Sequence, residues 1–473
     1  MNKFFCFLCV ISAFTGYAQM NKSTLDANVP ALAFPGAEGW GKWTSGGRGG
    51  KVLVVSSLND EGPGSLRDAI KAKGARIVVF SISGTIHLAS ALTITSDVTI
   101  AGQTAPGDGI CLADYPVNLK GNNIIVRYMR FRMGDKNQNK GMVDGAGSDD
   151  AFGGTRNNRV IIDHCSISWS TDEVCSVYAG DSTTLQWNLL AEPLNYSYHF
   201  ETGDKDFEHH GYGGIWGGRH ASFHHNLFAH CNSRTPRFDG NRNIPVTEQA
   251  DFRNNVIYDW GSNNVYAGEG GNYNVVNNYY KWGPSTGKAV KERVLNPYKK
   301  APNLPYGKFY LNGNWMDGSP AVTANNWLGV VMNEGTAADT ALSKVTAPFP
   351  AAPVMTQSAT DAYSLVLQQV GATLPRRDTL DQRIINDVKN RTGRMIDVQG
   401  GYLHGTPYSQ TVNAWPTLKT APVPKDADGD GMPDAWEKEK GLNPADAGDA
   451  AGYKLDKQYT NIEFYINSLA AKR

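Results

Sequence analysis

The chain has 473 residues and balanced charge, with 45 Lys and Arg against 45 Asp and Glu. A formal net charge of zero provides no global field to recruit nucleic acid or a membrane surface, so any attraction for an anion must be local, and nucleic acid is not expected as a partner. The 51 glycines and the scarcity of long amphipathic helical patterns favour a turn-rich, all-β fold.

Residues 1–18 are predicted to be a secretory signal peptide. Lys3 precedes an apolar run at 4–14, and Gly16-Tyr17-Ala18 supplies small residues before the cut. The run is too short to span a membrane. No cysteine follows the expected cut after Ala18, so we expect a soluble monomer, secreted or periplasmic, without a lipid anchor. The cysteines that remain are either buried free thiols or include one disulfide, and they are Cys111, Cys165, Cys175 and Cys231.

A short helix is predicted at 64–70, with Ser65 as its N-cap, and strand-like pieces follow at 77–80, 92–94 and 98–100. The central part of the chain then repeats one register, in which apolar positions flank a fixed fourth position. The fourth positions are separated by 36, 23, 38, 29 and 23 residues, and they are Met129, Cys165, Asn188, Asn226, Asn255 and Asn278. A basic coil of about 23 residues with loop insertions is typical of a parallel β-helix. The helix at 64–70 would close the open end of its first coil.

The asparagines at the fourth position have two interpretations. Stacked amides can form hydrogen bonds along the solenoid axis, as in side-chain ladders of stacked strands. Alternatively, Asn simply marks each turn. Both interpretations support stacked coils.

Acidic residues lie on the insertion-bearing side of neighbouring coils: Asp149 and Asp150 before one strand, and Asp172 and Glu173 after the next. Strands about 4.8 Å apart bring matching turns together, so these carboxylates are predicted to share one cation. Calcium fits best because it accepts six to eight oxygen ligands. The alternative is a set of solvated turn acids.

The segment 221–240 runs from a short apolar strand into the turn Arg234-Thr235-Pro236-Arg237. Pro236 fixes φ, so the two guanidiniums are presented in a defined direction, which suits a substrate rich in carboxylates. The alternative is a pair of surface arginines. The glycines at 211–218, one coil earlier, allow close approach of a ligand.

A zinc site is the competing interpretation for the histidines of this region, which are His209, His210, His220, His224, His225 and His230. Their spacing matches no known zinc ligand set, and alternation along strands would send several of the rings to opposite faces.

After about Pro284 the repeat weakens. We expect loops and one helix, at 380–389, packed along the outside of a solenoid domain that spans 32–420. The stretch Ala421-Pro422-Val423-Pro424 is interpreted as a linker into a small module at 421–473.

This module contains a calcium-loop pattern with a glycine at the sixth position and an acid at the twelfth. Its side-chain ligands are Asp426, Asp428, Asp430, Asp434 and Glu437. A helix is expected only after the loop, at 433–440, so the pattern predicts a structural Ca²⁺ that orders the module.

With these residues in view, the chain resembles the pectate lyases of polysaccharide lyase family 1, and specifically a secreted bacterial branch. The resemblance covers about 32–290 and includes the opening Phe34-Pro35-Gly36-Ala37-Glu38-Gly39-Trp40-Gly41, the segment Val160-Ile161-Ile162-Asp163-His164 and the Arg-x-Pro-Arg turn. The tail from Asp426 is similar to a thrombospondin type 3 or dockerin-like calcium repeat.

The resemblance implies a right-handed parallel β-helix and calcium-dependent β-elimination on polygalacturonate, with Arg234 as the base. Asp150 matches a calcium carboxylate of the family. Asp172 is one member of its acid pair, whose partner would fall on Ser168 or Ser176.

For substrate binding, Arg237 is joined by Arg242, which would replace a family arginine found here as Asp239. His210 or Lys205 would replace a family lysine. Asp163 is interpreted as structural, bonding turn amides.

Two other functions stay open. A polygalacturonase on the same solenoid would need paired acids for general acid and base catalysis. A non-catalytic pectin-binding β-helix would use the acids and arginines only to hold the ligand.

Overall fold

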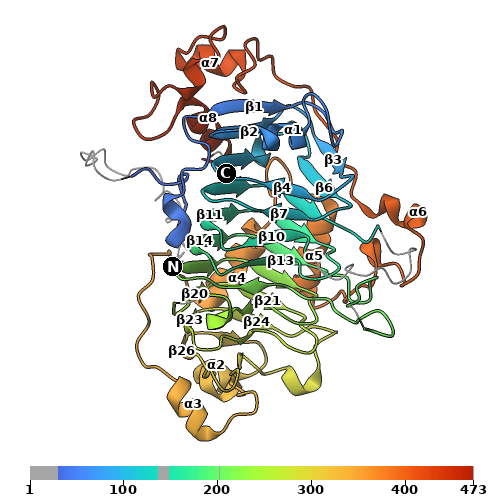
Figure 1. Cartoon of the computed structure of the whole chain (residues 1–473), viewed down its shortest axis with the longest axis vertical. Coiled ribbons are helices and arrows are strands. Elements are labelled where there is room, and N and C mark those ends of the chain that lie inside the picture. Colours follow the sequence, from blue (N-terminus) through green and yellow to red (C-terminus); the bar gives the residue numbers. More distant parts are fainter. Residues whose placement is uncertain (1–29, 137–148, 202, 245, 472–473) are drawn as a thin grey trace, which may run out of the picture.

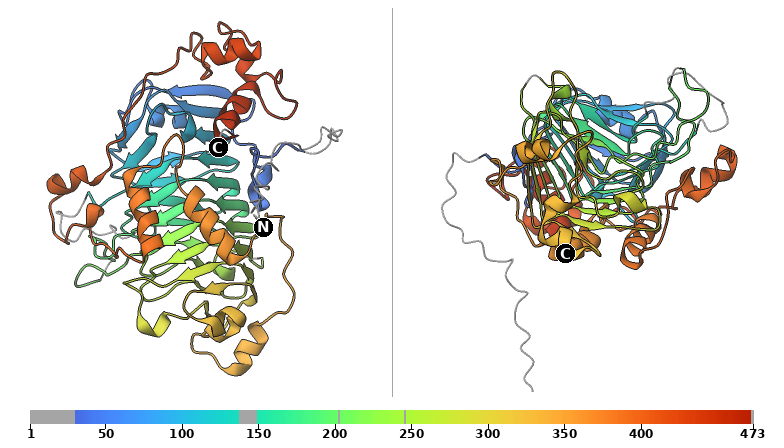
Figure 2. Two further views of the ribbon diagram at one scale, coloured as in Figure 1. Left: turned by 180° about the vertical axis from the view of Figure 1, so that it is seen from behind. Right: turned by 90° about the horizontal axis from the view of Figure 1, so that it is seen from below.

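The computed structural model describes residues 30–136, 149–201, 203–244 and 246–471; the predicted signal peptide lies outside them. Three parallel sheets form the faces of a solenoid, and the chain visits sheets A, B and C once in each coil (Figures 1 and 2). The prediction of a right-handed parallel β-helix is confirmed. No helix of the described residues is long and apolar enough to cross a membrane.

Sheet A consists of β1 (Lys51–Val55), β2 (Arg76–Phe80), β5 (Val98–Ala101), β8 (Ile124–Arg127), β11 (Asn158–Asp163), β14 (Asp181–Gln186), β17 (Ala221–His224), β20 (Gln249–Arg253), β23 (Asn272–Val276) and β26 (Lys308–Asn312). Sheet B consists of β3 (Gly84–His87), β6 (Ile110–Ala113), β9 (Arg130–Arg132), β12 (Ser166–Ser168), β15 (Leu189–Ala191), β18 (Leu227–Ala229), β21 (Val256–Tyr258), β24 (Tyr279–Lys281) and β27 (Trp315–Met316). Sheet C consists of β4 (Leu92–Ile94), β7 (Val117–Leu119), β10 (Phe152–Thr155), β13 (Cys175–Tyr178), β16 (Ile215–Trp216), β19 (Arg237–Phe238), β22 (Tyr266–Ala267) and β25 (Asn296–Pro297).

The solenoid continues one coil beyond the limit predicted from the sequence. Strands β25, β26 and β27 extend the three sheets to Met316, whereas the repeat was expected to end near Pro284. The fourth position of this coil is Asn314, which lies 36 residues after Asn278 in the segment that was expected to form loops.

The seven corners that lead from sheet A into sheet B between β8 and β27 have two residues each. The first has a positive φ between 51° and 67° in every corner, as at His164 and Asn254. The second occupies the fourth position of the repeat, and from Asn188 onward it is asparagine. Each Asn side chain in the series donates to the next at 2.9–3.0 Å, so the predicted amide ladder is confirmed, and it extends further through Asn314 and Asn326.

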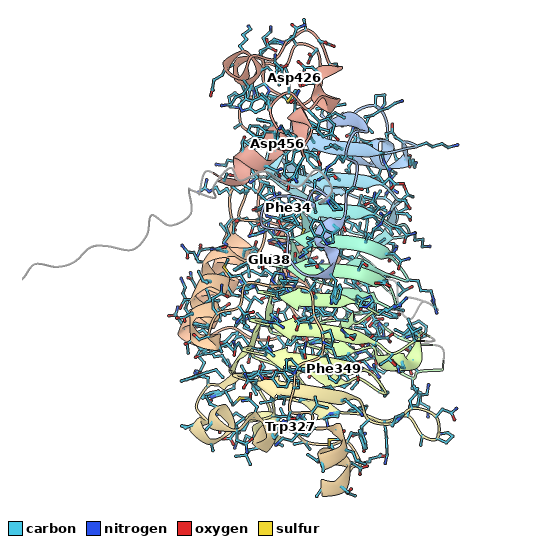
Figure 3. All side chains as sticks on the ribbon, turned by 90° about the vertical axis from the view of Figure 1, so that its left-hand side faces the viewer. Phe34, Glu38, Trp327, Phe349, Asp426 and Asp456 are labelled. Atoms are coloured by element: carbon cyan, nitrogen blue, oxygen red, sulfur yellow. The ribbon has the colours of Figure 1, made fainter. Side chains whose placement is uncertain are left out.

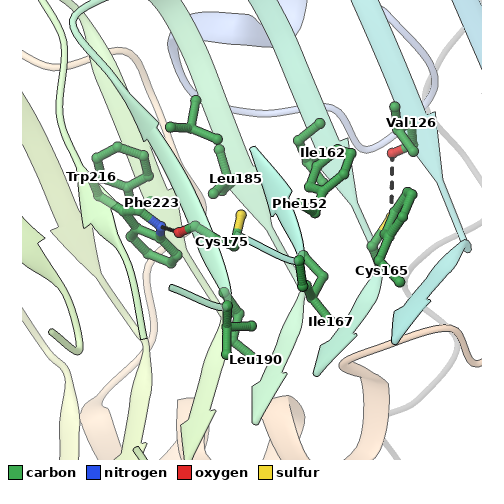
Figure 4. Close-up of a cluster of buried hydrophobic side chains, with 14 of the residues drawn as sticks. Val126, Phe152, Ile162, Cys165, Ile167, Cys175, Leu185, Leu190, Trp216 and Phe223 are labelled. Atoms are coloured by element: carbon green, nitrogen blue, oxygen red, sulfur yellow. Dashed lines mark hydrogen bonds between the residues drawn. The ribbon is translucent and has the colours of Figure 1, made fainter. Parts of the chain in front are cut away.

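The interior is filled by stacked apolar side chains from all three sheets (Figure 4). Phe152, Trp216 and Phe223 are fully buried, and Trp216 Nε1 donates to the Cys175 carbonyl at 2.9 Å. Cys111, Cys165, Cys175 and Cys231 are buried free thiols, which resolves the alternative that the sequence left open.

Helices cover the ends and one face of the solenoid. Helix α1 (Leu66–Lys71) begins at Ser65, whose side chain accepts from Asp68 N, and buries Leu66 and Ile70 against the first coils, as predicted. The helices α4 (Ala359–Gln369) and α5 (Thr379–Asn390) pack on sheet B (Figure 2, left). The short helices α2 (Pro320–Ala324) and α3 (Ala337–Ser343) follow the last coil, and α6 (Tyr408–Thr411) lies between α5 and the C-terminal segment.

Asp163 is buried, and its partners differ from those predicted. Its carboxylate pairs with Arg127 Nε at 2.7 Å and His164 Nδ1 at 2.8 Å, and it accepts from Gln186 Nε2 at 2.7 Å. The prediction that it bonds turn amides is wrong, because side chains from the two neighbouring strands reach it first. The Phe34 ring, labelled in Figure 3, covers the Arg127 guanidinium at 3.6 Å.

Candidate active site

The predicted chemistry-bearing residues converge at the corners that lead from sheet B into sheet C. Asp150 precedes β10, Glu173 precedes β13, Tyr212 precedes β16 and Arg234 precedes β19. Backbone bridges link Glu173 to Tyr212 and Tyr212 to Ser233. Because these strands stack in register, the four side chains form one row across four successive coils, which we call the B–C row.

Three carboxylates of adjacent coils meet at one end of the B–C row. Oxygen atoms of Asp150, Asp172 and Glu173 all lie within 4.8 Å of one another, and Glu173 N donates to Asp150 Oδ1 at 3.1 Å. Burial and the charge of Asp172 raise the pKa of Asp150 well above its usual range, although Ser176 and Arg234 act against this. Burial and Asp172 also raise the pKa of Asp149, to about 6. Nearby cations therefore do not offset the burial and mutual repulsion of these carboxylates.

Arg234 is joined to this cluster directly. Its Nη1 forms an ion pair with Glu173 Oε1, and its guanidinium lies 4.3 Å from the centre of the Tyr212 ring. The side chain keeps 23% of its surface exposed, whereas that of Glu173 keeps 5%. The φ of Arg234 is 59°, a conformation that is uncommon for a residue with a side chain.

The long corner between β15 and β16 adds imidazoles beside Asp172. His210 Nε2 lies 2.5 Å from Asp172 Oδ1, and its Nδ1 lies 3.1 Å from Glu208 Oε2. His199 is fully buried, with its ring 4.0 Å from that of His210. Ligand atoms of Asp172, His199 and His210 lie within 4.8 Å of one another.

An open cleft of about 560 Å³ runs along sheet C beside Asp150. Gly153 and Gly154 of β10 form part of its lining, together with Ser176 and Tyr178 of β13. Glycine in the strand leaves the backbone accessible. A polar cleft that begins at the carboxylate cluster has room for sugar rings next to the B–C row.

Sequence comparison finds relatives of known description that match almost the whole chain. Probable pectate lyase C from Aspergillus fumigatus is 35% identical over 448 residues, spanning 93% of this chain and 94% of the relative. Probable pectate lyase C from Aspergillus flavus is 34% identical over 460 residues, spanning 94% and 96%. The chain belongs to the pectate lyase family. It is therefore an enzyme, a polysaccharide lyase.

Comparison with solved structures finds weaker likenesses. A pectate lyase bound to a hexasaccharide has a TM-score of 0.49 and 14% identity, covering 71% of this chain and 96% of that one. Jun a 1, the major allergen of cedar pollen, has a TM-score of 0.48 and 16% identity, covering 71% and 92%. No protein-family model matches the chain.

The other predicted substrate-binding residues of this pectate lyase are not brought into the B–C row. Arg237 is 9% exposed, and its Nη2 pairs with Glu269 Oε1 at 2.6 Å. Arg242 lies past the opposite end of β19 and pairs with Asp239 at 2.9 Å. Lys205 is exposed on the long corner, with no ion pair to a described residue. The guanidiniums of Arg237 and Arg242 are engaged because sheet C supplies acids at neighbouring positions.

The histidines considered for a zinc site are dispersed, as alternation along strands predicts. His230 pairs with Asp259 at 2.7 Å and faces α5. His225 Nε2 donates to Gln357 Oε1 at 2.7 Å, and His220 lies 2.9 Å from Asp181. Sequence reasoning missed His199 and Glu208, because the long corner that holds them is an insertion outside the repeat register.

The second group of predicted ligands lies at one end of the molecule, in the module labelled at Asp426 in Figure 3. Oxygens of Asp426, Asp428 and Asp430 lie within 4.8 Å of one another. Asp434 is the exception, because its two oxygens accept from Lys425 Nζ at 2.7 Å and Ala427 N at 2.8 Å. Glu437 instead joins Asp430 and Asp449, a residue that lies beyond the sequence pattern.

Proposed function

We propose that this pectate lyase cleaves α-1,4-polygalacturonate by calcium-dependent β-elimination and that Arg234 is the base. The observation that carries the proposal is the position of Glu173 in the B–C row. Its backbone N donates to Asp150 Oδ1, and its carboxylate pairs with the Arg234 guanidinium. A cation in the cluster and the guanidinium of Arg234 can therefore contact the same uronic acid ring. The named relatives are pectate lyases, and this agrees with a pectate substrate.

The carboxylate cluster fits calcium by its chemistry. Ca²⁺ binds oxygen ligands at about 2.4 Å, so two ligands on opposite sides of the ion are separated by about 4.8 Å, the span within which Asp150, Asp172 and Glu173 lie. These three residues, with Asp149 beside them, leave coordination positions for the substrate. When bound, the ion supplies positive charge that neutralises a galacturonate carboxylate and so acidifies its C5 proton.

Glu173 explains how arginine can act as a base. A guanidinium paired with a carboxylate is held in its charged form, which opposes proton abstraction. Engagement of Glu173 as a calcium ligand would take this counter-ion away from Arg234. Tyr212 and the fixed turn would keep the Arg234 side chain in place.

The step conserves atoms and electrons as follows. Arg234 takes the C5 proton, the C5–H electron pair forms the C4=C5 double bond, and the C4–O4 glycosidic bond breaks. The leaving oxygen takes a proton from water. His210 is proposed to contact the substrate, since it lies beside Asp172 at the edge of the row, and Arg237, Arg242 and Lys205 stay candidates for more distant sugar units.

The test is incubation with polygalacturonate and Ca²⁺ while the ultraviolet absorbance of the unsaturated uronide is recorded. Arg234→Ala is expected to lower kcat by 10²–10⁴-fold, the usual contribution of a general base, without a change in the melting temperature. Arg219→Ala is the matched control, because that side chain is 57% exposed and remote from the row. Activity of Arg234→Ala within threefold of wild type would overturn the assignment.

The same assay separates the alternatives. Reducing ends that rise without the absorbance would indicate a polygalacturonase. Substrate binding without either signal would indicate a pectin-binding β-helix.

Location and assembly are proposed from the sequence. Residues 1–18 are proposed to direct secretion or export to the periplasm, and sequencing of the exported chain is expected to find Gln19 first. The chain is proposed to be a monomer of a bacterial branch of the family, and light scattering of the purified chain tests its mass.

A further inference from the structure

The C-terminal segment from Asp426 forms a small unit at the first end of the solenoid, beside β1 and β2 (Figure 1). It contains α7 (Asp434–Lys440) and α8 (Asn461–Ala471), and α7 confirms the helix predicted after the acidic loop. The B–C row lies further along the solenoid, so neither the family chemistry nor the proposed base uses this unit.

Five carboxylates of the unit form one connected cluster. Asp426, Asp428 and Asp430 have oxygens within 4.8 Å of one another, and so do Asp430, Glu437 and Asp449. Asp430 belongs to both groups and therefore joins them. Glu437 is fully buried and Asp430 is 2% exposed, although acidic side chains are rarely buried without a partner.

Most of these oxygens lack a hydrogen-bond donor. Both oxygens of Asp428 and of Glu437, and one oxygen each of Asp430 and Asp449, are buried and unpartnered. A buried carboxylate without a compensating charge or donor is strongly destabilising. The ammonium of Lys425 pairs instead with Asp434, outside the cluster. The partner that the five carboxylates lack is a cation.

The loop backbone fixes these side chains in place. Asp426 accepts from Gly429 N at 2.8 Å and from Gly431 N at 2.9 Å, and Asp430 Oδ1 accepts from Met432 N at 2.8 Å. Gly431 has a φ of 88°, which a residue with a side chain rarely adopts. The remaining oxygens are thus held ready before any ion binds.

The cluster is continuous with the contact between the unit and the solenoid. Met432 directly follows the loop glycine and Ala450 directly follows Asp449, and both are buried in one apolar cluster with Ile77 and Val79 of β2. A Cβ on Gly431 would lie 2.8 Å from Val79 Cγ2, so the loop itself rests on the strand. Nearby, Arg48 Nε pairs with Glu463 Oε1 of α8 at 2.9 Å.

We propose that Asp426, Asp428, Asp430, Glu437 and Asp449 bind Ca²⁺ and that this ion holds the C-terminal unit against the first coils of the solenoid. An all-carboxylate donor set of irregular geometry suits calcium better than magnesium or zinc. Asp449 replaces Asp434 as a ligand. The ion fixes Met432 and Ala450 together, so its removal loosens the unit from β2.

The experiment compares hydrogen exchange of the full chain with and without Ca²⁺, using EGTA to remove the ion. Amides of β2 and α8 are expected to exchange at least tenfold faster without Ca²⁺. Asp449→Asn and Glu437→Gln are expected to shift the Ca²⁺ concentration for half-protection at least tenfold upward. Glu439→Gln is the control, since that side chain is on the exposed side of α7 and pairs with Lys440.

A second comparison separates this ion from the one proposed for catalysis. Asp172→Asn is expected to keep the Ca²⁺-dependent protection of β2 and α8, because Asp172 belongs to the carboxylate cluster at the B–C row. Protection that does not respond to Ca²⁺ in the wild-type chain, or an Asp449→Asn variant with the wild-type midpoint, would overturn the proposal.

Discussion

Replacing Asn226 by alanine tests what the amide ladder contributes to stability. Asn226 is fully buried, and its Oδ1 accepts from both the backbone and the side-chain nitrogen of Asn188, at 2.9 and 3.0 Å. Its Nδ2 donates to the Leu185 carbonyl, the His224 carbonyl and Asn255 Oδ1, at 2.9–3.1 Å. A methyl group satisfies none of these five contacts.

The magnitude follows from the groups left unpaired. Two donors of Asn188 and the Leu185 carbonyl lose a buried partner, and each unpaired buried group costs about 1–3 kcal/mol. Since the small cavity admits some relaxation, Asn226→Ala is expected to lower the free energy of unfolding by about 3–5 kcal/mol. Few single substitutions exceed this range.

Urea denaturation followed by tryptophan fluorescence measures the loss. Asn413→Ala is the control, because Asn413 is exposed outside the solenoid, and its effect is expected to stay within about 0.5 kcal/mol. A loss below about 1 kcal/mol for Asn226→Ala would refute the reasoning, since it would mean that the ladder is not a set of obligatory partners.

Three further outcomes are expected. Although burial opposes protonation of His230, its hydrogen bond to Asp259 raises its pKa to about 9. Protonated His230 therefore contributes about 3 kcal/mol of stability, which is complete below pH 6.5 and lost as the pH rises through 9. His230→Gln should flatten the free energy of unfolding measured across pH 6–9.5, and curves parallel to those of the wild type would contradict this. Arg132 is fully buried against two aspartates at the start of α5. Arg132→Met should lower the free energy of unfolding by about 3–5 kcal/mol and speed hydrogen exchange in α5. Unchanged exchange would show that these ion pairs do not hold α5 on the solenoid. A Cβ at Gly214 would lie 1.9 Å from the Cys175 carbonyl oxygen, so Gly214→Ala should lower the melting midpoint and kcat together, and a variant with wild-type values would show that β13 and β16 move apart freely.

The sequence predicted the features that repeat. The fourth-position register placed Asn188, Asn226, Asn255 and Asn278 in one ladder because each coil imposes the same corner. Asn314 was missed because it lies beyond Pro284, in a segment whose several prolines led us to expect loops.

The sequence likewise predicted some residues of the candidate site and missed others. Asp150 and Glu173 were found because they lie on the insertion-bearing side of neighbouring coils, and Arg234 because it lies in the Arg-x-Pro-Arg turn. Each lies two or three residues before a strand of sheet C, so the stacking of strands determines their neighbours. His199 lies in a corner of 23 residues whose path depends on tertiary contacts. Asp449 was missed for a related reason, since it approaches Glu437 from outside the calcium-loop pattern.

The constant two-residue corners between sheets A and B have a consequence for how such an enzyme changes. Any added residue there would displace an amide from its neighbours above and below, so insertions lie elsewhere in each coil. On the side where sheet B leads into sheet C, the connections range from three residues between β6 and β7 to 23 between β15 and β16. That side also carries the acids and Arg234. The A–B corners thus stay constant in length while the B–C connections can change in length and sequence. Exchanging the segment 192–214 between relatives is therefore a rational way to alter which pectins are accepted.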